Sequence, residues 1–151
     1  GFVKNSEFMV ADVYDFAVQK TYDAVIINDL FYTKHVDFYA LIGKYAGFLK
    51  PGGFLYFDIQ DERAGPIWRA FGKDAEFRRY DLKDVAKALA QLGLSVMPVT
   101  PSLGIKGGIK GGLDGAMRKG LWYTAGIALA GYLGTRKVIA TAPLRVLREL
   151  S

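Results

Sequence analysis

The residues best suited to chemistry in this chain are carboxylates and an amide that stand where apolar runs end. Asp12 follows a short apolar run at residues 8–10, and Asn28 and Asp29 follow a second run at residues 24–27. Uninterrupted apolar runs of this kind predict strands covered on both faces, as in parallel sheets. Because open α/β sheets bind ligands at the carboxyl ends of their strands, these polar side chains mark a candidate binding edge.

His35 is the only histidine, and the chain contains no cysteine. An imidazole can accept a proton from a hydroxyl or amine near neutral pH, so His35 is a candidate general base, although a solvated loop side chain is the simpler interpretation. The absence of cysteine excludes disulfides, thiolate metal sites and cysteine nucleophiles. One histidine also excludes a multi-histidine site, so no metal is expected.

Helices and tight turns alternate with the apolar runs. Apolar residues at spacings of three and four predict a helix over residues 37–49, with Asp37 as its cap. The sequence KPGG at 50–53 predicts the end of that helix and a tight turn into a strand at 54–59. A second helix over 82–92, ended by Gly93, precedes a strand within 94–99, and a terminal strand is expected within 142–150. This alternation predicts an α/β sandwich with a mostly parallel sheet.

The basic residues concentrate at the C-terminal end. Residues 1–100 hold 12 basic and 13 acidic residues, whereas residues 101–151 hold 8 and 2. This excess favours an anionic partner such as a phosphate, nucleic acid or lipid headgroup, or else a solvated basic surface. Nucleic acid is disfavoured because the basic residues do not alternate with aromatic ones. The repeat GIKGGIKGG at 104–112 could cradle an anion but does not match a phosphate-loop motif, and a flexible loop is the simpler interpretation.

The uncharged run at 120–135 has 16 residues, fewer than the roughly 20 of a membrane-spanning helix. It therefore predicts a buried or interfacial helix. The expected location is the cytoplasm, with peripheral membrane contact left open. At 151 residues the chain is expected to form one domain.

Four motifs in order, ADVYDF, YDAVIINDLFY, HVD and LKPGGFLYFD, resemble the second half of a class I S-adenosylmethionine-dependent methyltransferase. The resemblance covers residues 8–60 and extends less strongly to about residue 100. It implies a Rossmann-like three-layer sandwich around a seven-stranded sheet, with S-adenosylmethionine as the cofactor. Residues 101–137 would form a lid or insertion between the sixth and seventh strands.

The resemblance also implies roles for single residues. Asp12, with Val13 beside it, would accept a hydrogen bond from the adenine amino group, although a helix or turn cap is the alternative. Asn28 and Asp29 would lie beside the methionine part of the cofactor, with Leu30 next to them. His35 would be the general base, and the expected substrate contacts are Phe31, Gln60, Asp61 and Arg63.

The glycine loop GxGxG that holds the cofactor in this family is missing, because no two glycines in the chain stand two positions apart. The resemblance begins near the third strand, so the first two strands are expected to be absent. We therefore expect residues 1–151 to be the C-terminal part of one methyltransferase domain, inactive alone. A short protein that completes its sheet by exchanging strands with a partner is the alternative.

The sequence thus predicts methyl transfer to a small molecule, with a lipid-linked or glycan precursor as one candidate. The competing hypothesis is a non-catalytic α/β interaction module that binds an anionic surface through residues 104–137. Neither the acceptor atom nor the oligomeric state follows from the sequence.

Overall fold

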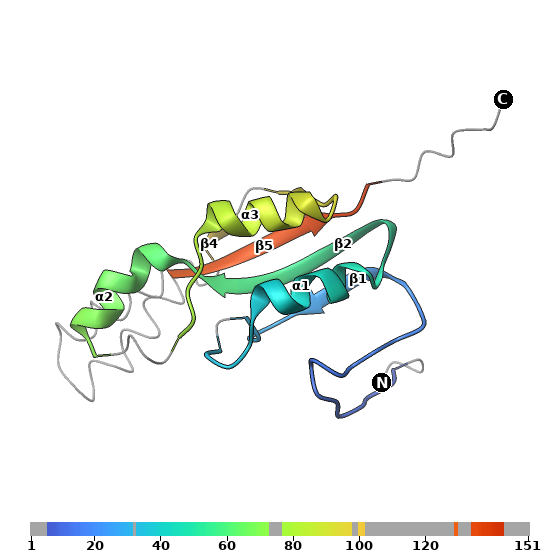
Figure 1. The fold of residues 1–151 in the computed structure, drawn as a ribbon, viewed down its shortest axis with the longest axis horizontal. Coiled ribbons are helices and arrows are strands. Elements are labelled where there is room, and N and C mark those ends of the chain that lie inside the picture. Colours follow the sequence, from blue (N-terminus) through green and yellow to red (C-terminus); the bar gives the residue numbers. More distant parts are fainter. Residues whose placement is uncertain are drawn as a thin grey trace.

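The structure is a computed structural model, and it describes residues 6–31, 33–72, 77–97, 100–101, 129 and 134–143. Its elements follow one another as strand, helix, strand and two short helices, then a longer helix and three strands (Figure 1). In chain order they are β1 Tyr22–Ile27, α1 Phe38–Ala46, β2 Leu49–Gln60, the 3₁₀ helix η1 Glu62–Ala64, α2 Gly65–Ala70, α3 Leu82–Gln91, β3 Ser95–Val96, β4 Thr100–Pro101 and β5 Thr135–Thr141.

The strands form one sheet in the order β1-β2-β5-β3, and β4 also pairs with β5. β1 and β2 are parallel, whereas β5 runs antiparallel to β2, β3 and β4. All described strands except β5 therefore point in the same direction. The prediction of a mostly parallel α/β sheet is confirmed.

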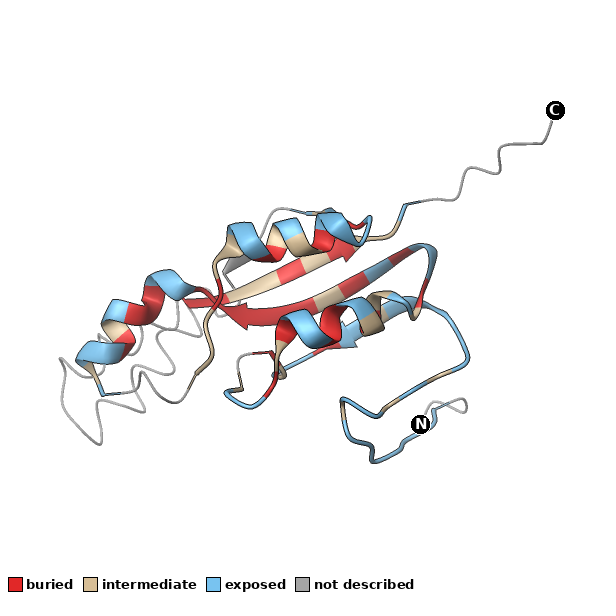
Figure 2. Cartoon of the chain, viewed as in Figure 1, coloured by how far each residue is buried: buried red, intermediate tan, exposed pale blue. Residues whose placement is uncertain are grey.

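The core lies on one face of this sheet. Leu55, Phe57 and Ile59 of β2 are fully buried, and they belong to one cluster with residues of α1 and α3 such as Leu41 and Leu89. Figure 2 shows the buried residues of α1 and α3 facing the sheet. The two helices therefore cover the same face.

In the part of the chain that the structure describes, the opposite face is open on β1 and at the beginning of the regular part of β2. Ile26 of β1 and Phe54 of β2 lie on this face and are 62% and 40% exposed. Side chains alternate between the faces of a strand, so these two point away from the buried Leu55 and Phe57. A three-layer sandwich needs a further layer here.

The helices predicted over residues 37–49 and 82–92 are both present. Asp37 caps α1, because its carboxylate accepts hydrogen bonds from the N–H groups of Tyr39 and Ala40. The helix was predicted to end at residue 49, which is three residues beyond the observed end of α1 at Ala46. α3 ends at Gln91, and Gly93 just beyond it has a φ of +76°. A left-handed residue at this place is typical of a helix end, and glycine adopts it without a steric penalty.

The KPGG segment forms an irregularity inside β2 rather than a turn before it. Leu49 already pairs with Tyr22, and regular pairing resumes at Ala24 and Phe54. Gly52 has a φ of +78°, and a Cβ atom on Gly53 would lie 3.0 Å from the backbone oxygens of Asp23 and Lys50. The second glycine therefore allows β1 and β2 to approach each other closely.

One predicted strand is corrected. Residues 8–10 form no strand, and Phe8 and Val10 are 94% and 106% exposed. A strand needs a neighbour for its N–H and C=O groups, and no described strand lies beside this segment. β5, Thr135–Thr141, was not predicted, and pairing with β2 and β3 stabilises it although it carries two charged side chains. The terminal strand predicted within 142–150 lies outside the described residues from residue 144 onward.

Other expectations lie mostly outside the described residues. These are the lid or insertion at 101–137, the glycine loop at 104–112 and the helix near 121–134, of which Leu129 and Gly134 are described and helical. In the described part of the chain, no helix has the length and apolarity needed to cross a bilayer.

Gly53→Ala should destabilise the fold by about 1–3 kcal/mol, because the added methyl group meets backbone oxygens that cannot rotate away. Gly43→Ala in α1 is the matched control, since its Cβ meets only the end of the Leu92 side chain at 3.7 Å. There alanine should stabilise the helix by about 0.5–1 kcal/mol. Urea unfolding followed by circular dichroism measures both changes. Equal effects of the two substitutions would contradict this account of KPGG.

Candidate active site at the carboxyl ends of β1 and β2

The centre of the candidate site is a hydrogen bond that joins the ends of β1 and β2. The backbone N–H of Asp29 donates to Oδ1 of Asp58 over 2.9 Å. Asp29 has a φ of +58°, a left-handed conformation that is uncommon for a residue other than glycine. The bond to Asp58 helps to hold this conformation, so the chain turns sharply at the edge of the sheet just after Asn28.

Asp58 is a buried carboxylate, 8% exposed, although it lies at the end of the sheet. Burial raises the pKa of Asp58, and the hydrogen bond from the Asp29 N–H opposes that rise. Burial dominates because moving a charge out of water costs more than one hydrogen bond returns. Asp58 is the last residue of the motif LKPGGFLYFD, and no role was assigned to it from the sequence.

The predicted cofactor residues after β1 divide between the surface and the core. Asn28 and Asp29 are exposed at the rim, and Leu30 is half-buried against the core. Phe31 is fully buried, with its ring 5.1 Å from Phe38 and 5.5 Å from Phe57. The prediction that Phe31 contacts substrate therefore needs correction, since its ring is a part of the core.

Asp12 and Val13 belong to a loop that is attached to α1. Lys44 donates to the backbone oxygens of Val13 and Tyr14 at 3.3 and 2.6 Å, and the Asp37 N–H donates to the Tyr14 hydroxyl at 2.9 Å. Asp12 is exposed, and its carboxylate accepts a hydrogen bond from the Tyr14 N–H over 2.7 Å. It therefore caps a turn in this structure. Its contact with adenine stays a prediction.

The side chain of His35 is exposed in the loop before α1. The Tyr14 hydroxyl lies 3.4 Å from the backbone oxygen of His35, so the loop is anchored through its main chain. An exposed imidazole is available to accept a proton. No contact fixes it near Asp29 or Asp58, and its role as a general base stays a prediction.

Asp61, directly after β2, is engaged by two arginines. It is 1% exposed, forms an ion pair with Arg63 through Nη2 and Nε, and accepts from Nε of Arg136 at 3.2 Å. These guanidinium groups lower the pKa of Asp61 although its burial alone would raise it. Its carboxylate therefore joins η1 to the start of β5. The predicted substrate contact of Asp61 would have to compete with both arginines.

Gln60 is buried beside Asp61, and its side-chain nitrogen donates to the Thr135 hydroxyl at 2.9 Å. A Cβ on Gly134 would lie 2.5 Å from Oε1 of Gln60 and 3.0 Å from the Ala64 side chain. Gly134 thus permits the close approach of β5 to the end of β2. The roles of Gly134 and Arg136 could not be predicted from the sequence, because each stands about 75 residues along the chain from its partner, Gln60 or Asp61.

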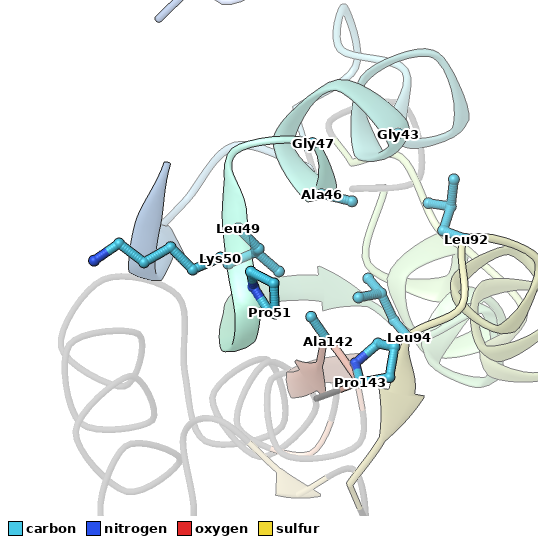
Figure 3. A pocket seen from close by; sticks show the side chains of 10 residues that line it. All are labelled: Gly43, Ala46, Gly47, Leu49, Lys50, Pro51, Leu92, Leu94, Ala142 and Pro143. Carbon is cyan, nitrogen blue, oxygen red and sulfur yellow. The ribbon is translucent and has the colours of Figure 1, made fainter. Parts of the chain in front are cut away.

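A second hollow lies away from this rim. A cavity of about 370 Å³ is bounded by the C-terminal ends of α1 and α3 and by the start of β2 (Figure 3). Its charged residue, Lys50, forms an ion pair with Asp23 at 2.9 Å, and the remaining lining is apolar or glycine. It offers no group for acid–base chemistry. No cluster of three metal-ligating side chains occurs among the described residues either.

No protein-family model matches the chain, and no curated protein matches it in sequence. Solved structures do. A chain from the complex of the Haloferax volcanii Trm112 methyltransferase activator with a methyltransferase is 21% identical, with a TM-score of 0.61. Geranyl diphosphate C-methyltransferase from Streptomyces coelicolor is 15% identical with a TM-score of 0.61, and the [4+2]-cyclase SpnF is 16% identical with a TM-score of 0.55.

These alignments cover 90%, 90% and 91% of this chain but 61%, 52% and 56% of the respective structures. The fold is therefore that of the class I S-adenosylmethionine-dependent methyltransferases, Rossmann-like and incomplete. The chain spans between half and two thirds of the length of these proteins. SpnF is named as a cyclase, so the fold alone does not decide the activity.

Asp58→Asn should raise the melting temperature at pH 7, because asparagine keeps the acceptor for the Asp29 N–H and removes the buried charge. A raised pKa stabilises the fold below the ordinary carboxyl pKa, and this contribution is lost as the pH rises through the folded value. The gain should therefore shrink as the pH falls toward 3.8. Thermal unfolding from acid to neutral pH, with the exposed Asp15→Asn as control, tests this. A lower melting temperature at pH 7 would disprove it.

Asp61→Asn should destabilise the fold by about 3 kcal/mol or more, because it leaves the largely buried Arg136 without its carboxylate. A lowered pKa stabilises the fold above the ordinary value of 3.8, and that stability is lost as the pH falls through the folded value. The cost of the substitution should therefore be full at neutral pH. Asp23→Asn, which breaks an exposed ion pair with Lys50, should change little. Similar losses from both substitutions in urea unfolding would refute the role of Asp61.

Proposed function

We propose that this chain is the substrate-side part of an S-adenosylmethionine-dependent methyltransferase that acts on a small molecule. The observation that carries the proposal is the bond between the Asp29 N–H and Asp58, which brings the polar ends of two parallel strands to one rim. That rim is where open α/β sheets bind ligands. The similar structures include complexes with S-adenosylhomocysteine, among them the Streptomyces coelicolor enzyme with geranyl diphosphate.

The residues at the rim suit one end of the cofactor. Asn28 and Asp29 are exposed and offer an amide and a carboxylate, which can bind the ammonium and carboxylate groups of a methionine moiety. The sharp turn at Asp29 keeps both side chains at the end of β1. Asp12 does not contact this rim, so the described residues would hold the methionine end and the adenine end would need further contacts.

The cofactor, when bound, supplies an activated methyl group on a sulfonium. Transfer of that group is an in-line displacement, so the protein has to align the acceptor and exclude water. His35 is our proposed acceptor of the proton from a hydroxyl or amine substrate. Lipid-linked and glycan precursors remain proposed acceptors, and a cytoplasmic location, with or without membrane contact, belongs to the same proposal.

The open edge and face of the sheet support the proposal that the complete sheet contains more than the described strands. β1 pairs on one side with β2, and no described strand pairs with its other side. We propose that residues outside this chain supply the glycine loop and the neighbouring strand, either upstream in the same protein or from a partner. Binding through residues 104–137 as an interaction module gains no support from the described residues.

Isothermal titration of the full-length protein with S-adenosylmethionine tests the proposed function. We expect binding, and we expect Asn28→Ala to weaken it by about tenfold, the loss of roughly one hydrogen bond to a charged group. Gln19→Ala, which removes an exposed amide from the loop before β1, should leave the affinity unchanged. If the wild-type protein binds no cofactor, or if both variants behave alike, the proposed site is wrong.

A further inference from the structure

A polar hollow, separate from the apolar cavity described above, lies just beyond the carboxyl end of β2. It has a volume of about 600 Å³ and is formed by η1, by α2 and by the segment before α3. Of the six described residues that line it, three are arginines and one is acidic. The lining residues are Glu62, Arg63, Gly65, Pro66, Arg69 and Arg79.

Two of the arginines converge above Gly65. A Cβ atom at Gly65 would lie 3.4 Å from Nε of Arg79 and 3.6 Å from Nη1 of Arg69. Arg69 stands four residues after Gly65 in α2 and so projects from the same side of the helix. Arg79 comes from a different segment, directly before Tyr80. The bare glycine thus gives room for guanidinium groups from two parts of the chain to meet.

The third arginine brings further positive charge. Arg63 and Arg136 share the single carboxylate of Asp61, so these three side chains together carry a net charge of +1. The side chain of Arg63 is 66% exposed on the side of the hollow, while Asp61 is covered. Among the described lining residues, Glu62 is the one that is acidic.

A guanidinium carries five N–H donors, so a partner on one edge leaves donors on another. An anion can therefore bind even where each arginine already has a protein contact. Arginine forks fit the two oxygens of a carboxylate or a phosphate, and such charged hydrogen bonds are the strong ones.

We propose that this pocket binds an oxyanion, a phosphate or a carboxylate, and that this oxyanion is part of the methyl acceptor. The second half of the proposal rests on the proposed function. Glu62 follows Asp58 by four residues, so the pocket begins at most about 14 Å from the rim along the chain. A small molecule can therefore place its anionic group against Arg69 and Arg79 while its acceptor atom lies at the ends of β1 and β2.

Nitrogen-15 NMR of the arginine Nε–H groups in the full chain tests the pocket directly. Inorganic phosphate and malonate are the two probes, and the stronger binder identifies the preferred oxyanion. We expect the Arg69 and Arg79 signals to shift and saturate. The Arg78 signal should not move, because Arg78 pairs with Asp37 at 2.9 Å and does not line the pocket.

Arg69→Gln should weaken binding of the preferred probe by about tenfold or more, as expected for one charged hydrogen-bond donor. Arg69 is exposed, so the variant should fold, and circular dichroism checks this. Lys87→Gln removes the same charge from an exposed position of α3 and should leave binding unchanged. Arg69→Lys should fall between the two, because it keeps the charge and loses the fork.

Unmoved Arg69 and Arg79 signals would overturn the proposal, and so would equal losses in Arg69→Gln and Lys87→Gln. Binding of the cofactor and binding of the oxyanion probes are judged separately. If the pocket binds phosphate or malonate but the full-length protein does not bind S-adenosylmethionine, the oxyanion site stands and its assignment to a methyl acceptor falls. If the full-length protein binds S-adenosylmethionine but neither phosphate nor malonate binds, the pocket proposal fails and the proposed function stands.

Discussion

The pairing of β2 on both sides is the constraint on which the rest of this structure depends. β1 joins it in parallel and β5 joins it in antiparallel, so the backbone of residues 54–57 is hydrogen-bonded from both neighbours. Where both neighbours pair with it, the strand can place Leu55 and Phe57 in the core without leaving polar backbone groups unpaired. The same strand then carries Asp58 and Gln60, with Asp61 directly after them, to one end of the sheet. The core and the candidate site are therefore two parts of a single strand.

The open face of the sheet has a physical meaning. Isolated exposed apolar side chains are common, but Ile26 and Phe54 lie on the same face of two neighbouring strands. Exposed apolar sheet surface next to a free strand edge favours association with another segment. The similar structures are longer than this chain by a margin that would accommodate such a segment. Residues 8–10, although β-prone, do not form a strand here, because no described strand lies beside them.

Local patterns predicted most of the elements, because their causes are local. Asp37 caps α1 through N–H groups two and three residues away, and Gly93 ends α3 by its own conformation. β5 was not predicted from the sequence, because its stability comes from pairing with β2 and β3, at separations of about 80 and 45 residues. Phe31 was assigned to the site from its position after a strand, yet packing against Phe38 and Phe57 decides its place. Sequence spacing places a residue near an edge, whereas tertiary packing decides whether its side chain is accessible.

The two carboxylates near the end of β2 are driven in opposite directions by their surroundings. Burial and the neighbouring Asp29 carboxyl raise the pKa of Asp58, and the hydrogen bond from the Asp29 N–H opposes this rise, so the protonated form is favoured more than in water. Asp61 is buried more deeply but faces two guanidinium groups, so its charged form persists. Active sites often contain such divergent pairs, because one group can then exchange a proton while the other provides a fixed charge. Asp61, directly after this strand, is already bound by its arginines and suits the fixed role. Asp58, whose pKa is raised chiefly by burial, is the carboxylate at the rim where the cofactor is proposed to bind.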